Sequence, residues 1–120
     1  MPEKTDIWMP LYIGDYLADT SHLDTLEHGA YLLLLMHYWR KGPLENNPKA
    51  LLSITKLHGP EASSLLQALL DGFFQLSEDG KWHQERADKE RARSLQIQQN
   101  YHDRAIRGGE ATRLKWESRA

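Results

Sequence analysis

Histidine and glutamate side chains gather at the start of the most apolar segment of the chain. His22 and His28 lie on either side of Glu27, and His37 follows in the same segment. Zinc-binding helices place two histidines four residues apart, so that both imidazoles share one face. His28 and His37 are nine residues apart and fall on different faces. We therefore predict no metal site here, and we interpret His28 as a capping residue or a buried, hydrogen-bonded residue.

Three aspartates, Asp15, Asp19 and Asp24, precede or open the same segment. Paired carboxylates can serve acid–base chemistry or hold the metal ions of a nuclease. Aspartates just before helices are commonly N-caps, however, and these three stand where caps are expected. The sequence also has no glycine-rich phosphate loop, no nucleophile elbow and no cysteine. We therefore predict a non-enzymatic protein without a cofactor or a bound metal.

Positive charge is concentrated towards the C-terminus. Residues 1–85 carry 6 Lys/Arg and 12 Asp/Glu, a net charge of −6, whereas residues 86–120 carry 9 and 5, a net charge of +4. An acidic globule with a basic arm is typical of an interaction tail, and arginines beside aromatic residues can bind nucleic acid. The alternative is a solvated helix rich in arginine, with the tryptophan packed on a neighbour. The predicted nucleic-acid contacts are Lys81, Arg104, Arg107, Arg113, Lys115 and Trp116.

Composition indicates one small soluble domain. The chain has 120 residues, of which 40% are hydrophobic, enough for one modest core. No signal peptide is visible, and the longest apolar run, residues 30–36, is too short to span a bilayer. We expect a cytoplasmic protein without a membrane partner.

Capping signals predict three helices. The first begins at Asp24 or Thr25, since Asp24 with Glu27 or Thr25 with His28 has the spacing of an N-cap and the third helical residue, and it ends before a Gly-Pro pair at 42–43. The second covers residues 47–59, with asparagine as its cap and proline at its first position.

The third helix is predicted over residues 60–72. Its opposite face, away from the apolar stripe, carries no lysine or arginine, which argues against specific DNA binding by this helix because phosphate contacts need cations. The apolar stripe follows the helical period and comprises Ala62, Leu65, Leu66, Leu69 and Leu70.

Two short strands should follow, joined by a tight turn. A two-residue loop would turn Trp82 away from Leu76, whereas a three-residue loop at 78–80 places the two side chains opposite each other on one apolar face. The pattern favours the longer loop, with Gly80 in the left-handed conformation.

The two ends of the chain are less regular. Residues 7–13 are rich in strand formers but contain Pro10, so we predict an edge strand or extended segment with Trp8 and Tyr12 on the surface, followed by a turn at Gly14-Asp15. A charged helix is predicted from Gln84 or Arg86 to about residue 106, where a Gly-Gly pair should break it.

These elements predict a mainly α fold with a small β-hairpin. Three helices followed by a hairpin have the order of a winged helix-turn-helix, here over residues 1–88. The basic C-terminal helix and tail would form a second part, residues 89–120.

The segment WMPLYIGDYLADTSHLDTLEHGAYLLLLMHYWRKGPL at 8–44 resembles the YdaU-type family of phage and prophage proteins, a domain of unknown function. The similarity continues through FFQLSEDGKWHQERAD at 73–88 and, more loosely, through 108–116. It implies a winged-helix-like domain found among phage replication genes, and it supplies no catalytic residue. The positions that match the family pattern, most of them structural, are Trp8, Tyr12, Gly14, Tyr16, His28, Gly29 and Tyr31.

Two functions follow as expectations. The first is a phage-derived DNA-binding accessory protein of replication or transcription in the bacterial cytoplasm, which contacts duplex or single-stranded DNA through the basic arm. The alternative is a protein-interaction module that binds a replication or host protein, or forms a homodimer, without touching DNA.

Overall fold

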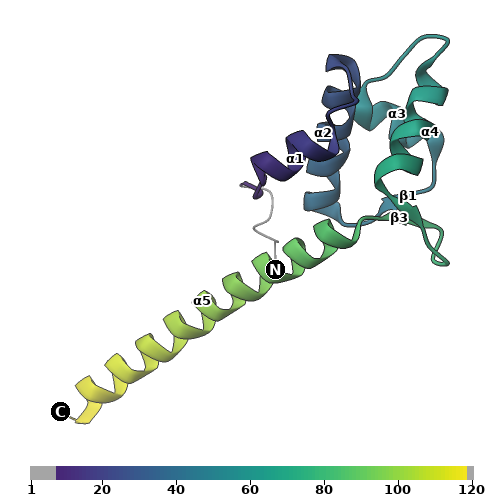
Figure 1. The fold of residues 1–120 in the computed structure, drawn as a ribbon. Helices are drawn as coiled ribbons and strands as arrows, with labels where there is room; N and C mark the ends of the chain where they lie inside the picture. Colours follow the sequence, from purple (N-terminus) through teal and green to yellow (C-terminus); the bar gives the residue numbers. More distant parts are fainter. Residues whose placement is uncertain (1–7, 119–120) are drawn as a thin grey trace.

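The computed structural model describes residues 8–118, in which a helical domain with a small sheet continues into a long projecting helix (Figure 1). The predicted fold class, mainly α with a small hairpin and a C-terminal charged helix, is confirmed. Within the described residues, no helix is both long enough and apolar enough to cross a bilayer. The helices are α1 (Ile13–Asp19), α2 (Thr25–Lys41), α3 (Pro48–Thr55), α4 (Ala62–Phe73) and α5 (Glu85–Ser118); the strands are β1 (Leu44–Glu45), β2 (Gln75–Leu76) and β3 (Lys81–His83).

Helix α2 begins with the predicted capping box. The side chain of Asp24 accepts a hydrogen bond from the Glu27 N–H at 2.8 Å, and the Glu27 carboxylate accepts one from the Asp24 N–H at 3.0 Å. Two N–H groups that have no partner within the helix are satisfied in this way. The helix ends at Lys41, where Gly42 takes a positive φ of 89°.

The core forms around α2. Leu34 and Tyr38 of this helix are completely buried, and Leu51 of α3, Leu69 of α4 and Trp82 of β3 close over them. Burying a leucine side chain contributes roughly 2 kcal/mol of hydrophobic stabilisation. The apolar character of α2 on nearly all sides thus reflects its central place in the domain.

The hairpin has the predicted register. Leu76 is paired with Trp82, the turn occupies residues 78–80, and Gly80 has a φ of 78°. Because β2 is an edge strand, Leu76 lies at the margin of the core and stays half exposed. The sequence did not reveal β1, which pairs with β3 through Leu44 and Trp82 and completes a sheet of order β1-β3-β2.

The N-terminal prediction was partly wrong. Residues 8–12 form no strand, although the extended alternative is met at Tyr12, whose backbone is extended, and the expected turn at Gly14-Asp15 lies inside α1; Ile7 lies outside the described residues. Pro10 cannot donate to a ladder, whereas Asp15 favours a helix start because its charge meets the positive end of the helix dipole. Trp8 and Tyr12 are exposed on the surface, as predicted.

Helices α3 and α4 do not end at the glycines where the sequence predicted their ends. Helix α3 stops at Thr55 because Lys56 takes the left-handed conformation, with a φ of 63°, ahead of Gly59. Helix α4 starts at Ala62 rather than at the proline and continues through Gly72 to Phe73. Packing of α4 on the core outweighs the preference of Gly72 to end the helix.

Helix α5 starts at Glu85, within the predicted range, but the predicted break near residue 106 was wrong. The helix continues through Gly108 and Gly109 to Ser118. Each glycine costs about 1 kcal/mol relative to alanine, which weakens a helix without forbidding it. The hydroxyl of Thr112 also donates to the Gly108 carbonyl at 3.0 Å.

Replacing both glycines with alanine should strengthen the outer half of α5. A Cβ at Gly108 or Gly109 meets nothing within 4 Å, so the gain is about 1 kcal/mol of helix stability per site. Far-UV circular dichroism and amide hydrogen exchange of residues 104–116 measure it. The variant Gly72→Ala in α4 is the matched control and should leave exchange in the arm unchanged. Unaltered exchange in the double variant would show that the arm is not helical at the glycines.

Candidate functional site

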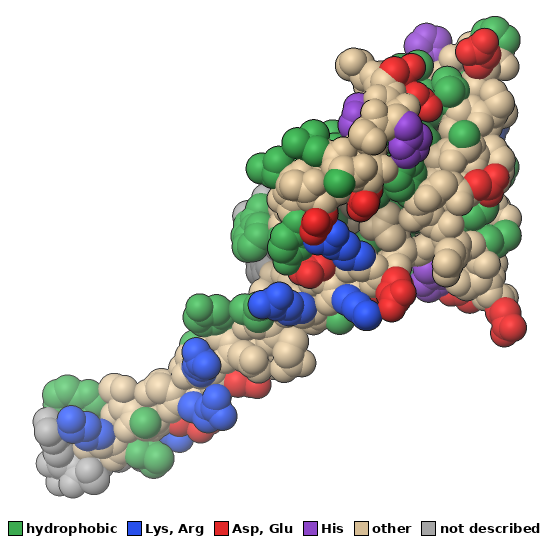
Figure 2. Space-filling model, viewed as in Figure 1, with side chains coloured by type: hydrophobic (Ala, Val, Ile, Leu, Met, Phe, Trp, Pro, Cys, Tyr) green, Lys and Arg blue, Asp and Glu red, His purple; other side chains and the backbone are tan. Residues whose placement is uncertain are grey.

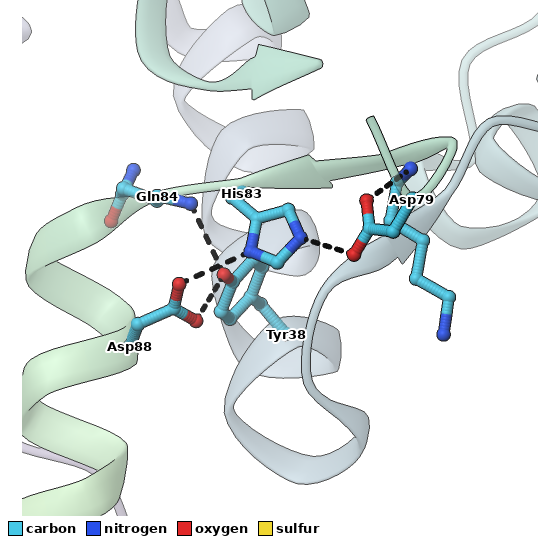
Figure 3. A network of polar contacts seen from close by, with 6 residues as sticks. Tyr38, Asp79, His83, Gln84 and Asp88 are labelled. Atoms are coloured by element: carbon cyan, nitrogen blue, oxygen red, sulfur yellow. Dashed lines mark hydrogen bonds and ion pairs between the residues drawn. The ribbon is translucent and has the colours of Figure 1, made fainter. Parts of the chain in front are cut away.

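A set of polar side chains, here called the polar junction, joins the hairpin, α2 and the start of α5 (Figure 3). The Tyr38 hydroxyl donates to Asp88 Oδ1 and accepts from the Gln84 N–H at 3.1 Å. His83 lies 3.2 Å from Asp88 through Nδ1 and 2.8 Å from Asp79 through Nε2. The junction therefore ties three elements together at the base of the arm.

The contacts of His83 indicate a protonated ring. A carboxylate only accepts hydrogen bonds, so an imidazole between two carboxylates must donate from both nitrogens. The bonds to Asp79 and then to Asp88 raise the pKa of His83 above its usual value. The bond from His83, followed by the Lys81 N–H, lowers the pKa of Asp79.

Tyr38 serves as a neutral donor in the same cluster. Its burial, and then its bond to Asp88, raise the pKa of the phenol far above its usual value. Tyr38 is completely buried, so the carboxylate of Asp88 is the group that satisfies its hydroxyl.

Further contacts set the direction in which α5 leaves the domain. Arg91 donates through Nε to the Trp39 carbonyl at 2.7 Å, and the Gln84 amide donates to the Tyr31 hydroxyl at 3.0 Å. Arg86 pairs with the Asp15 carboxylate at 2.8 Å, and its guanidinium lies over the ring of Tyr12. Arg91 is thus part of the fold, although the sequence placed it among the cations of the arm.

Most cations of α5 share one face of the helix. They are separated by three, four, eight or eleven residues, which are close to whole numbers of turns at 3.6 residues per turn. From Arg86 to Lys115 the row is about 44 Å long at 1.5 Å per residue. Figure 2 shows blue side chains following the arm. We call this row the basic stripe; it comprises Arg86, Lys89, Arg93, Arg104, Arg107 and Lys115.

The structure brings together only part of the predicted contact set. Arg104, Arg107 and Lys115 lie on the basic stripe, whereas Arg113 and Trp116 fall on other sides of α5 by the helical period. Lys81 lies in β3, outside the arm. The hairpin turn and the arm leave the domain in opposite directions (Figure 1).

Some cations of the stripe already have partners. Lys89 pairs with Glu85 at 3.0 Å, and the Arg104 guanidinium lies 5.9 Å from the centre of the Tyr101 ring. Arg93 and Arg107 form no ion pair with any residue between 8 and 118. The outer cations are therefore exposed side chains that an anionic ligand can reach.

The histidines near the start of α2 contact aromatic side chains of the fold. His28 Nδ1 lies 2.8 Å from the Tyr16 hydroxyl, which confirms that His28 is a hydrogen-bonded residue. His22 instead stacks on the ring of Phe73. In the part of the chain that the structure describes, no three His, Asp or Glu side chains are arranged to hold a metal ion.

The sequence predicted neither the polar junction nor the fact that the cations of the basic stripe share one face of α5. Asp79 and His83 are four residues apart but are separated by the hairpin turn, so their spacing did not indicate a contact. Asp88 lies in the first turn of α5, where an acidic residue is itself a local signal of a helix start. The stripe was missed because a break at residues 108–109 would have separated Lys115 from the cations before it.

The polar junction predicts a pH dependence of stability. His83 has a raised pKa in the folded state, so its stabilising effect is complete below 6.5, its ordinary value, and is lost as the pH rises through the folded pKa. The free energy of unfolding, from urea denaturation, should fall as the pH rises above 6.5 in the wild type.

In His83→Gln this fall should disappear, whereas His102→Gln, which changes an exposed histidine of the arm, should keep the wild-type profile. Identical profiles for the wild type and His83→Gln would show that the junction does not hold a protonated histidine.

Comparison with known proteins agrees with the resemblance seen in the sequence. The family described as "Protein of unknown function (DUF1376)" matches residues 7–92, most of the chain. The uncharacterized protein YdaU of Escherichia coli (strain K12) is 61% identical over 41 residues, which are 33% of this chain and 14% of YdaU. The matched segment thus spans about a seventh of that relative's length. No solved structure matches the chain. The coverage shows that the chain belongs to the DUF1376 family of proteins of unknown function.

Proposed function

We propose that the protein is a phage-derived, non-enzymatic DNA-binding accessory protein of replication or transcription. It would contact the phosphates of DNA through α5. The observation that carries this proposal is the basic stripe, a row of cations along one face of an uninterrupted helix. A row of cations on one face of a helix suits a polymer that carries closely spaced negative charge. The resemblance to phage proteins supports the replication context.

The order of elements supports a winged-helix interpretation of the domain. Helix α2, strand β1, helices α3 and α4 and the hairpin β2–β3 follow one another as in that fold, and β1 completes the sheet beside β3. Helix α4 would then occupy the place of a recognition helix.

Helix α4 is nevertheless a poor candidate for binding phosphate. It contains no lysine or arginine, and on its exposed face Gln67 donates to Asp71 at 2.9 Å. Residues 1–85 also have a net charge of −6, which repels a polyanion. We therefore assign the main DNA contact to the arm, and we expect backbone binding with little sequence preference.

The alternative, a protein-interaction module, is supported by the neutral face of α4. Its exposed side chains, which include Ser63, Ser64 and Gln67, could contact a replication or host protein without the repulsion that DNA would meet. Changing Ser64 and Gln67 to arginine would weaken such a contact and leave the arm intact.

Binding to duplex and single-stranded DNA over a salt series tests the proposal. Each phosphate contact contributes about 0.9 to the slope of log K against log salt concentration for duplex DNA. Replacing Arg104 and Arg107 with glutamine should therefore lower the magnitude of the slope by about 2.

The matched control is the double variant Arg40→Gln with Lys49→Gln, which removes the same charge from exposed residues of α2 and α3. It should keep nearly the wild-type slope. Binding that is insensitive to salt, or that falls equally in both double variants, would overturn the assignment of the contact to the arm.

A further inference from the structure

A pocket of about 450 Å³ lies between the N-terminal segment, α1, α2 and the start of α5. Its walls are largely aromatic, with Tyr12, Tyr31 and Phe73 among them, and Tyr31 stacks on Phe73 with ring centres 4.3 Å apart. Two carboxylates, Asp19 and Glu90, also line it. Arg86 lines it as well, so two acidic groups face one basic group, and the pocket suits a large apolar side chain that is accompanied by a positive charge.

The surface beside this pocket is apolar and uncovered. None of the residues of α1 is buried, and Ile13 and Leu17 are 68% and 59% exposed. Hydrophobic side chains gather on the left side of the domain in Figure 2. Exposed apolar patches that adjoin a pocket commonly mark a protein interface. We call this surface the α1 face; it comprises Trp8, Leu11, Tyr12, Ile13 and Leu17.

The arm carries a second set of exposed apolar side chains. By the helical period, Ile106 and Trp116 point away from the basic stripe, and Arg113 lies between them on this side of α5. The outer half of α5 projects from the domain (Figure 1) and contains two glycines, each of which weakens a helix by about 1 kcal/mol, so a packing partner would stabilise it. We call this side the apolar side of the arm.

The arm cannot cover the pocket of its own molecule. Glu90 lines the pocket, and Trp116 lies about 39 Å further along the same continuous helix at 1.5 Å per residue. Figure 1 shows the arm running away from the domain, and the molecule is 74 Å long. Only another molecule can bring an arm to this surface while α5 remains intact.

We propose that two copies of the chain associate reciprocally, with the apolar side of each arm lying on the α1 face and pocket of the other. Trp116 has the size to enter the aromatic pocket, and Arg113 has the charge to meet Asp19 and Glu90. Residues 1–85 and 86–120 carry net charges of −6 and +4, so each arm is attracted to the opposite domain.

A two-fold dimer of this kind makes the same contact twice, which doubles the surface that is buried. The outer cations of the basic stripe, Arg104, Arg107 and Lys115, face away from the contact, so nucleic-acid binding by this part of the arm is a separate property. Measurements without nucleic acid therefore test self-association whatever the outcome of the DNA experiment.

Mass measurement by analytical ultracentrifugation of the full chain tests the dimer. The wild type should sediment as a dimer, and Ile13→Asp with Leu17→Asp should sediment as a monomer with an unchanged circular dichroism spectrum of the domain. Leu26→Asp changes a residue of equal exposure, 59%, outside the α1 face and should remain dimeric. The variant Arg104→Gln with Arg107→Gln should also remain dimeric. A monomeric wild type, or a dimer that survives the change in α1, would overturn the proposal.

Thiol cross-linking distinguishes the reciprocal arrangement from pairing between arms. The chain has no cysteine, so Leu11→Cys on the α1 face and Thr112→Cys on the apolar side of the arm each introduce a single thiol. Mild oxidation of a mixture of the two variants should give a cross-linked dimer with one copy of each. Cross-linking of Thr112→Cys with itself in preference to the mixture would show that the arms pair with each other and would overturn the proposal, as would a mixture that cross-links no better than one with Ser53→Cys, an exposed site on α3.

Discussion

The hydrogen bond between the Tyr38 hydroxyl and the Asp88 carboxylate is the contact on which the arrangement of the molecule depends. Tyr38 belongs to the most buried part of α2, and Asp88 lies in the first turn of α5. A buried phenol without a partner would lose roughly 1 to 3 kcal/mol, so the core itself requires this carboxylate. The start of the arm is consequently held to the centre of the domain, and His83 extends the link to the hairpin turn.

Because the start of α5 is anchored, the basic stripe holds a fixed direction relative to the acidic domain. The acidic residues belong mainly to the domain, and the basic stripe runs outward along a helix that starts from a fixed position. Because α5 keeps its period through the two glycines, cations on both sides of them share one face. The result is an extended positive edge beside an acidic body, which explains why we assign contact with phosphate to the arm rather than to α4.

Most local features of the fold were predictable from neighbouring residues. The capping box at Asp24, the asparagine cap of α3 and the register of Leu76 with Trp82 all follow from side chains that act within a few positions of one another. The wrong predictions arose where a local residue preference competes with the packing of the whole fold. Gly14, Gly108 and Gly109 are weak helix formers, but α1 and α5 tolerate them, and β1 was too short to leave a pattern.

The sequence by itself determined the helical class of the protein, its hairpin and the uneven distribution of its charge, because these depend on composition and on spacing along the chain. Only the tertiary structure decided that His83 bridges two carboxylates, that Arg91 is used by the fold, and which cations of α5 share a face. The hydrogen bonds of Asp88 with Tyr38 and of Arg91 with Trp39 join residues about fifty positions apart, which no local preference encodes. The shared face of the cations depends on α5 continuing through two glycines that locally disfavour a helix.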